Sequence, residues 1–444
     1  MKRSRITIAF AFALLLFAFA SNAFAQTPAE RIAAIQSALR ETKGEAKLDG
    51  WLFYDFRKSD PLAYRILKLD EKGITTRRWF YYIPVSGEPV KIVHSIERSK
   101  LDQLPGKRVV YRRWQELQAG LREALAGSDR SIGKRGTPKR IAMQYSPENS
   151  IPYISRVDAG TLESVRSIPG ISIESSADLV QRFEAVWTPE QREMHTEAAN
   201  KIHRIITESF AEIAHRINAN QPTTEYDIQQ FMMRRYEEEA LTSDNDPPNV
   251  SVNANSANPH YQPDSKIFSP IKRGDFVLFD VWAKLKKPGA VYADQTWTGY
   301  VGETVPAEYT SVFRIVREAR DAATEFVRAA TRAGKSVGGA QVDDIARGII
   351  TRAGYGEQFT HRTGHSIGEE VHGNGAHIDN LETRDSRRII PRTCFSIEPG
   401  IYLEGKFGVR SEINVYVGER DIEVTGQPVQ TEVIPILQMS GVRQ

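Results

Sequence analysis

The sequence predicts an α+β protein of two domains that meet near residue 185. Between residues 27 and 177, short runs of aromatic and branched residues, typical of strands, alternate with helical patterns. After residue 185 a faint internal repeat of helix pairs indicates two similar α/β halves. The 444 residues are 40% apolar and 26% charged, so they hold enough apolar material for these cores.

The first 25 residues are typical of a secretory signal. Lys2, Arg3 and Arg5 precede an apolar run at residues 6–20, and the small residues Ala23 and Ala25 suit a cleavage site. We therefore expect cleavage after residue 25, a periplasmic or secreted protein, and no stable membrane insertion afterwards. An uncleaved anchor is the alternative.

The charge balance excludes one class of partner. Lys and Arg number 59 against 56 Asp and Glu, a net charge of +3 that falls to zero when the signal is removed. Nucleic-acid binding usually needs a clearly basic domain, so we expect no nucleic-acid partner.

The region 26–184 is predicted as a small α/β domain. Strands are expected at residues 51–56 and 79–85, and a helix at 114–126. This region has His94 as its single histidine and no evident cluster of polar groups. A structural or oligomerisation role is therefore favoured over a catalytic one.

The region 185–444 begins with helix signals. Thr188 and Gln191 form a capping box around Pro189, which predicts a helix to about residue 217, and a second helix is expected from Thr224. Residues 244–265, rich in Asn, Pro and Ser, predict a long loop. The repeat relates residues 208–227 to 325–344.

Carboxylates lie inside apolar strand patterns, where an unpaired charge is costly. Asp280 falls within the predicted strand 275–283, and Asp294 begins the next strand after a turn, so a hairpin would bring the two together. Glu398 follows the apolar run 394–397. Glu412 lies in a β-rich run at 408–417, where alternation places Arg410 on the same face, suited to hold Glu412.

Four of the nine histidines, His361, His365, His372 and His377, lie within 17 residues. Glycines flank His365, so we expect it in a strand or loop as a metal ligand, and not in a helical HExxH motif. We assign His377 to the core.

The charges of this set predict two metal ions. Four carboxylates and a neutral imidazole carry −4, which two divalent cations balance, whereas one would leave about −2 in a poorly solvated site. Oxygen ligands with one nitrogen suit Mn(II), Co(II), Fe(II) or Zn(II), and we expect Mn(II) first. Two such ions that bridge a hydroxide and polarise a carbonyl are typical of a hydrolase.

The ordered set Asp280, Asp294, His365, Glu398 and Glu412 resembles the ligands of the pita-bread metallopeptidases, which include methionine aminopeptidase, Xaa-Pro aminopeptidase and Xaa-Pro dipeptidase. The strings at 258–261, 363–368, 396–400 and 408–412 carry the resemblance. Residues 48–56 resemble the creatinase-type N-terminal domain, which methionine aminopeptidases lack, so the prolyl-cleaving branch is favoured.

The resemblance implies a pita-bread fold with pseudo-twofold halves at 185–444, preceded by the creatinase-type domain at 26–184. It implies that Asp280 binds one metal, that Asp294 and Glu412 bridge both, and that His365 and Glu398 complete the second site. Glu398 would also handle the proton of the bridging water. His260 would orient the peptide, His372 would donate to the carbonyl oxygen, and His361 and Arg410 would contact the substrate. Trp297 stands where many members carry a basic residue, which points to altered substrate preference.

We therefore expect an exported aminopeptidase that hydrolyses the N-terminal bond of peptides with proline in second position, as a homodimer or homotetramer. Three alternatives stay open: an Xaa-Pro dipeptidase, a hydrolase of this fold for non-prolyl peptides or organophosphate esters, and a metal-free relative. The last would be a creatinase-like enzyme or a non-catalytic binding module.

Overall fold

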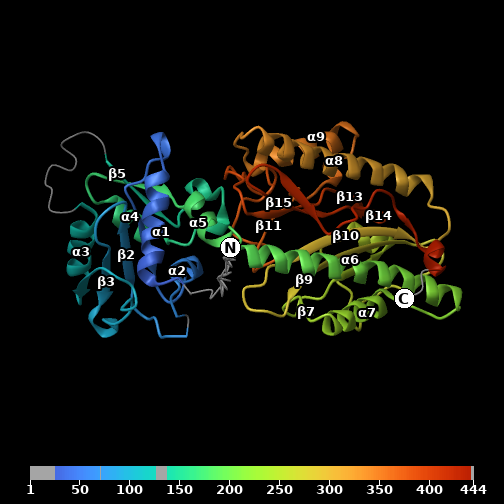
Figure 1. Cartoon of the computed structure of the whole chain (residues 1–444), viewed down its shortest axis with the longest axis horizontal. Helices are drawn as coiled ribbons and strands as arrows, with labels where there is room; N and C mark the ends of the chain where they lie inside the picture. The colour runs from blue at the N-terminus through green and yellow to red at the C-terminus, as the bar shows by residue number, and fades with distance from the viewer. Residues whose placement is uncertain (1–25, 71, 127–137, 442–444) are drawn as a thin grey trace, which may run out of the picture.

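The chain forms two bodies that meet between residues 184 and 189 (Figure 1). The structure, a computed structural model, describes residues 26–70, 72–126 and 138–441. The signal segment predicted for residues 1–25 lies outside them. Among the residues described, no helix has both the length and the apolar character needed to cross a membrane.

The N-terminal body is a six-stranded mixed sheet with helices on both faces. The strand order is β4-β3-β2-β1-β5-β6, in which β1–β2 and β2–β3 are antiparallel and the other pairs are parallel. Its strands are β1 (Gly50–Asp55), β2 (Trp79–Pro84), β3 (Val90–His94), β4 (Lys107–Tyr111), β5 (Lys139–Met143) and β6 (Ile171–Ser175). Its helices are α1 (Pro28–Glu41), α2 (Pro61–Leu67), α3 (Trp114–Ala126), α4 (Ala159–Arg166) and α5 (Ala177–Glu184).

Both faces of β1 are buried because side chains alternate along a strand. Trp51 and Phe53 enter a core with residues of α1, α2 and α5, whereas Leu52 and Tyr54 enter a second core with residues of α3 and α4. The predicted strands at 51–56 and 79–85 and the helix at 114–126 are therefore present, each within a residue of its expected bounds.

The C-terminal body begins with α6 (Pro189–Asn218), which is capped as the sequence predicts. The Thr188 hydroxyl accepts from the Gln191 N–H, and the Gln191 side chain returns the bond to the Thr188 backbone. The Thr224 hydroxyl caps α7 (Glu225–Glu238) in the same way. The second helix pair, α8 (Ala307–Arg332) and α9 (Gly339–Arg352), lies in the other stretch that the repeat relates.

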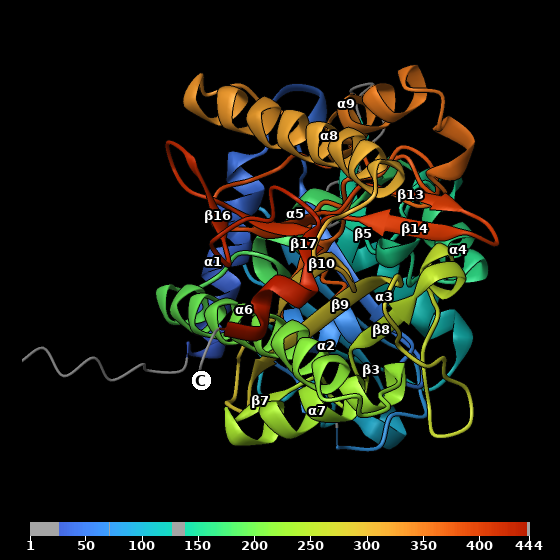
Figure 2. The ribbon, with the colours of Figure 1, turned by 90° about the vertical axis from the view of Figure 1, so that its right-hand side faces the viewer.

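Strands from the two halves lie between these helix pairs (Figure 2). In the first half β9 (Phe276–Leu285) pairs with β10 (Ala293–Tyr300), β7 (Leu241–Thr242) and β8 (Asn249–Val252), and β17 (Ile434–Pro435) adds to β10. In the second half β12 (Cys394–Ile397) lies between β11 (Ser366–Ile367) and β15 (Ile413–Val417), and β16 (Ile422–Thr425) follows. A separate hairpin joins β13 (Gly400–Leu403) and β14 (Phe407–Arg410).

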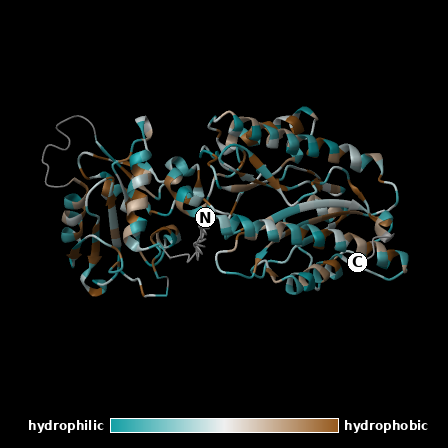
Figure 3. Ribbon diagram, viewed as in Figure 1, coloured by the Kyte–Doolittle hydropathy of each residue, from teal (hydrophilic) through white to brown (hydrophobic). Residues whose placement is uncertain are grey.

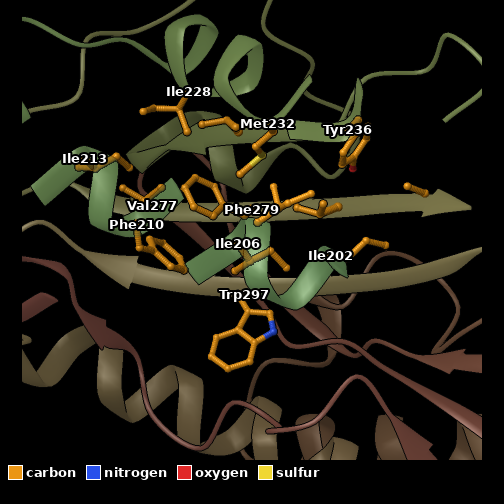
Figure 4. Packing of buried hydrophobic residues seen from close by; sticks show 14 of the residues in the cluster. Ile202, Ile206, Phe210, Ile213, Ile228, Met232, Tyr236, Val277, Phe279 and Trp297 are labelled. Carbon is orange, nitrogen blue, oxygen red and sulfur yellow. The ribbon is translucent and has the colours of Figure 1, made fainter. Parts of the chain in front are cut away.

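The helices carry hydrophilic and hydrophobic residues in alternation (Figure 3), as expected when one face packs on a sheet. Figure 4 shows the core formed by α6, α7 and the β9–β10 hairpin. Phe210 of α6 stacks on Phe279 of β9, with 4.3 Å between ring centroids. Trp297 belongs to this core and lies 5.0 Å from the ring of His203.

Two expectations about local structure need correction. The predicted loop 244–265 contains strand β8 and a 3-10 helix, η5 (Asn253–Ala257). The single β-run predicted at 408–417 is two strands of different sheets, because the chain leaves β14 at Arg410 and enters β15 at Ile413. Glu412 therefore lies in the break between them.

Candidate metal centre and active site

The β9–β10 hairpin brings two of the predicted ligands to one face. Asp280 pairs in register with Thr296, and Asp294 pairs with Trp282. Since alternate residues share a face, Asp280, Thr296 and Asp294 are neighbours on the same side of the hairpin. The Asn414 side chain accepts from the Asp294 N–H at 2.9 Å and donates to its carbonyl at 2.7 Å, which joins β10 to β15.

The second half of the domain supplies His365, Glu398 and Glu412. His365 immediately precedes β11, Glu398 immediately follows β12, and Glu412 lies between β14 and β15. One serine holds the first two, because the Ser396 hydroxyl accepts from the His365 N–H at 2.9 Å and donates to Glu398 Oε1 at 3.0 Å. The Thr296 hydroxyl lies 2.8 Å from Glu412 Oε2 and joins this half to the hairpin.

These side chains converge. His365 Nε2 lies 3.3 Å from Glu398 Oε1 and 3.7 Å from Asp294 Oδ2. Asp294, His365 and Glu412 are buried, and each presents a potential ligand atom within 4.8 Å of the other two. The five predicted ligands thus come from both halves and meet at the centre of the domain.

Among the described residues, neither Asp294 nor Glu412 forms an ion pair with a lysine or arginine. Asp294 Oδ1 and Glu412 Oε1 are enclosed and have no hydrogen-bond partner among the described residues. Burial, together with the charges of Asp280 and Glu398, raises the pKa of Asp294 well above its usual range. Burial and the charge of Asp294 do the same to the pKa of Glu412. Unpartnered anionic oxygens beside a neutral imidazole are the environment that a divalent cation satisfies, so the residues fit the predicted metals.

Asp280 is turned toward Arg410, which explains why it lies outside the closest group of three. Arg410 forms an ion pair with Asp280, donates from Nε to the Thr296 hydroxyl at 2.9 Å, and lies 3.8 Å from Glu398 Oε2. The expectation that Arg410 holds Glu412 directly therefore needs correction, because Thr296 stands between them.

The site opens into a cavity of about 750 Å³. Asp280, Asp294, His365, Glu398 and Arg410 line it, as do His260, His361 and His372. The His372 ring is perpendicular to that of His365, with 4.3 Å between centroids. Repulsion from His365 and burial lower the pKa of His372 to about 2, so its imidazole is neutral and can donate one N–H.

His361 is less free than the resemblance implies. Its Nδ1 lies 2.6 Å from the Arg362 carbonyl and its Nε2 lies 2.7 Å from the Tyr402 hydroxyl. The carbonyl requires a donor, so Nδ1 carries the proton and Nε2 accepts from Tyr402. His361 lines the cavity with both ring nitrogens already bonded to protein groups.

Sequence reasoning missed three residues of this site. Tyr402 orients His361, whereas Arg362 and Tyr153 line the cavity. Tyr153 comes from the N-terminal body and lies on the ring of His377, with 4.3 Å between centroids. Arg362 could have been noticed as a cation within the histidine cluster, but nothing in the sequence links Tyr153 to residues 209 positions away.

The prediction that Trp297 affects substrate preference also needs correction. It does not line the cavity, because it pairs with Phe279 and lies on the face of β10 opposite Thr296 and Asp294. Its replacement of a basic residue therefore alters the core against α6, and no argument about substrate preference follows from it.

Comparison with known proteins decides the family. Residues 195–419, about half of the chain, match the model of metallopeptidase family M24. The chain belongs to this family. The match contains all five candidate ligands and all three candidate histidines of the cavity.

Curated relatives and solved structures agree with the assignment. The chain is 34% identical to a Lactobacillus helveticus Xaa-Pro dipeptidase over 37% of this chain and 40% of that one, so it spans less than half of this relative's length. The fold matches dipeptidase PepE of Mycobacterium ulcerans with a TM-score of 0.62 and 22% identity, over 92% of this chain and 97% of that one. It also matches an X-prolyl aminopeptidase of Caenorhabditis elegans, which is described as having a di-nuclear active site. The TM-score is 0.59 and the identity 15%, over 92% of this chain and 63% of that one.

These likenesses confirm the predicted fold class. The M24 chain has the pita-bread domain with its two halves, and the coverage of 92% extends the likeness into the N-terminal body. The M24 match also supports divalent-metal binding at the cluster.

Proposed function

We propose that this M24 chain is an exported metallo-exopeptidase, of the aminopeptidase type, that hydrolyses the peptide bond before a proline in second position. The observation that carries the proposal is the buried group of Asp294, His365 and Glu412 at a cavity lined by three further histidines. Two carboxylate oxygens of this group have no hydrogen-bond partner within the described residues. The activities for which its relatives are named, Xaa-Pro dipeptidase and X-prolyl aminopeptidase, support the prolyl specificity.

Two divalent ions, Mn(II) first among Mn, Co, Fe and Zn, would be held by Asp280, Asp294, His365, Glu398 and Glu412. When bound, they would supply Lewis-acid polarisation of the scissile carbonyl and would acidify a water molecule. The four carboxylates carry −4 and the buried Arg410 carries +1, so two divalent ions together with one hydroxide would leave the site neutral, which supports the number of ions.

The remaining side chains are suited to proton transfer and positioning. Glu398 accepts a hydrogen bond from Ser396 and lies near Arg410, so its carboxylate is oriented to take a proton from the attacking water. His372 is neutral and would donate its N–H to the carbonyl oxygen as negative charge develops there. His260, exposed at the rim of the cavity, would orient the peptide.

The test is a panel of Xaa-Pro peptides with matched Xaa-Ala peptides, assayed after chelation and after reloading with Mn(II). We expect hydrolysis of the Xaa-Pro members, none after chelation, and recovery best with Mn(II) or Co(II). Equal hydrolysis of both series would indicate a non-prolyl peptidase. Full activity in chelator, with no metal retained on dialysis, would contradict the metal-dependent mechanism.

Export and assembly are proposed with the same function. Mass spectrometry of the protein recovered from the producing cell tests cleavage after residue 25, since an intact N-terminus would indicate an anchor. Light scattering tests the expected homodimer or homotetramer against a monomer.

A further inference from the structure

The position of the His372 ring depends on the backbone that carries it. Within the described residues the ring makes no hydrogen bond, and it contacts the His365 ring, with 4.3 Å between centroids. The backbone around it, residues 368–376, contains neither helix nor strand, and three of these nine residues are glycine. Because glycine restricts the backbone so little, the conformation of this loop depends on contacts with its surroundings.

The C-terminal body holds one side of the loop through Ser366. The Gly373 N–H donates to the Ser366 carbonyl at 2.7 Å, and the Gly375 N–H donates to the Ser366 hydroxyl at 2.9 Å. These bonds fix the backbone directly after His372.

The N-terminal body holds the side chains on either side of His372. Arg65 of α2 donates from Nη1 to Glu370 Oε1 at 2.9 Å. Glu184 of α5 accepts from the Asn374 side-chain amide at 3.3 Å. Glu370 and Asn374 are each two residues from His372. Arg65 Nε also donates to Glu184 Oε2 at 2.6 Å, so the two contacts are joined to one another.

The Arg65–Glu184 pair is packed where the two bodies meet. Helix α5 lies at this junction (Figure 1), and the Glu184 side chain is only 7% exposed. The next residue, Ala185, approaches the loop so closely that a Cβ added to Gly375 would lie 2.9 Å from the Ala185 Cβ. A buried, charge-assisted pair constrains geometry more strongly than an exposed ion pair, so Arg65 and Glu184 are suited to fix the loop.

We propose that Arg65 and Glu184 are positioning residues, which hold the loop 368–376 so that the His372 N–H faces the scissile carbonyl. The inference rests on the proposed function, in which His372 donates to the carbonyl oxygen as negative charge develops there. Such a donor stabilises the transition state only when its geometry is fixed in advance. The N-terminal body, for which the sequence favours a structural or oligomerisation role, thus contributes to catalysis through His372.

The kinetic experiment measures kcat and KM for alanyl-prolyl-alanine on the Mn(II)-loaded full chain. The variants are Arg65→Gln and Glu184→Gln, each made alone and in combination with His372→Ala. Arg182→Gln is the matched control, because Arg182 is also on α5 and forms an ion pair of 2.6 Å with Glu41 of the N-terminal body.

We expect Arg65→Gln and Glu184→Gln to lower kcat roughly threefold to thirtyfold, since removal of an oxyanion-hole donor costs more and misplacement costs part of it. KM should stay within twofold, because the weakened interaction forms in the transition state. In the His372→Ala background the same changes should lower kcat no further, since residues that act as a unit are not additive. Arg182→Gln should leave both constants unchanged.

Hydrogen exchange on the metal-depleted full chain tests the loop separately from activity. The amides of residues 368–376 should exchange faster in Arg65→Gln and Glu184→Gln than in the wild type or Arg182→Gln, because the loop opens at a lower free energy. Glu370→Gln changes a carboxylate that is 58% exposed, so it should fold and show a smaller acceleration. It carries the test if either of the other variants does not fold.

Two results would overturn the inference. One is exchange of residues 368–376 that is unchanged in the folded variants. The other is a loss of kcat that is equal with and without His372, which would indicate general damage to the domain. Failure of the proposed function gives a different pattern, in which the wild type hydrolyses no Xaa-Pro peptide with any metal while hydrogen exchange still reports whether the N-terminal body holds the loop.

Discussion

Removing one charge from the carboxylate cluster should have opposite effects on stability without and with metal. The changes are Asp294→Asn and Glu412→Gln, which keep the shape of each side chain. Asp294 Oδ1 and Glu412 Oε1 are enclosed and have no hydrogen-bond partner in the part of the chain that the structure describes, and the two groups repel one another. An amide in either place would present N–H donors to the remaining carboxylates, and the backbone bonds of Asp294 to Asn414 would be unchanged.

The magnitude follows from the unsatisfied groups. A buried polar atom without a partner costs about 1–3 kcal/mol, and more when it is charged. Each variant should therefore be more stable than the wild type in chelator by about 1–3 kcal/mol. For a domain of this size that corresponds to a rise of about 2–10 °C in the unfolding midpoint.

Addition of Mn(II) should reverse the order of stability of the wild type and the variants. A ligand that binds only the folded state adds about 2.7 kcal/mol at a concentration 100-fold above its dissociation constant. The wild type should gain this stabilisation from Mn(II), whereas each variant lacks one anionic ligand and should gain much less. Both variants should also lose peptidase activity while they stay folded.

The assay is thermal unfolding of the whole chain in chelator and in a Mn(II) series. Asp246→Asn is the matched control, because Asp246 lines the same cavity but is exposed and lies outside the cluster. It should change stability by no more than about 0.5 kcal/mol and respond to Mn(II) as the wild type does. Variants that melt below the wild type in chelator, or that gain as much from Mn(II), would refute the argument.

Three further predictions concern the scaffold. Burial lowers the pKa of His195 from 6.5 to about 4. Between these two pH values the unfolded chain binds a proton that the folded chain excludes, so the free energy of unfolding should fall by on the order of 3 kcal/mol as pH drops from 6.5 to 4. Urea unfolding of His195→Gln should show a shallower pH dependence, and an unchanged slope would contradict the assignment. Gly364→Ala should lower the free energy of unfolding by about 3 kcal/mol, because its Cβ would lie 1.9 Å from the Ser396 carbonyl oxygen, and calorimetry should detect no metal binding. Gly368→Ala is the control and should leave stability nearly unchanged, because its Cβ would lie 3.9 Å from the nearest neighbouring atom. Arg387→Ala should lower the free energy of unfolding in urea by about 3–5 kcal/mol, because it leaves the buried Asp385 without its ion-pair partner. Arg388→Ala, at the exposed neighbouring position, is the control, and an equal loss of stability in both variants would contradict the prediction.

Local signals were sufficient for much of the fold. The cap at Thr188 marked the start of α6, since a hydroxyl that accepts from the third backbone N–H is a local interaction, and the start of α7 near Thr224 was also predicted. The hairpin from Phe276 to Tyr300 was predicted by an apolar run with an acid in its interior, followed by a Pro-Gly turn and a second strand-like run. The β8 strand was missed because its four residues lie in an Asn- and Pro-rich stretch, and its pairing with β9 is a tertiary contact.

Some features of the candidate site were likewise predictable from the sequence, and others were not. Acids within apolar strands and a histidine between glycines were visible as anomalies, because burying an unpaired charge is costly wherever the strand lies. The face on which each side chain would fall was not visible, so the residue at Trp297 was linked to substrate preference although its side chain packs against α6. The direct partner of Arg410 was likewise assigned to Glu412, although Thr296 and Asp280 occupy that place.

The amino-acid sequence by itself determined the capped start of α6, the β9–β10 hairpin, and which acids and histidines had no reason to be buried unless they bind something. Only the tertiary structure decided which of those groups share a proton or an ion pair, since this depends on distances between segments more than 100 residues apart. It alone showed that Arg362 has no carboxylate ion-pair partner among the described residues, and that Tyr153 contacts its guanidinium from the other domain. The physical reason is that backbone preferences act over a few residues, whereas electrostatic partnership is set by packing of the whole chain.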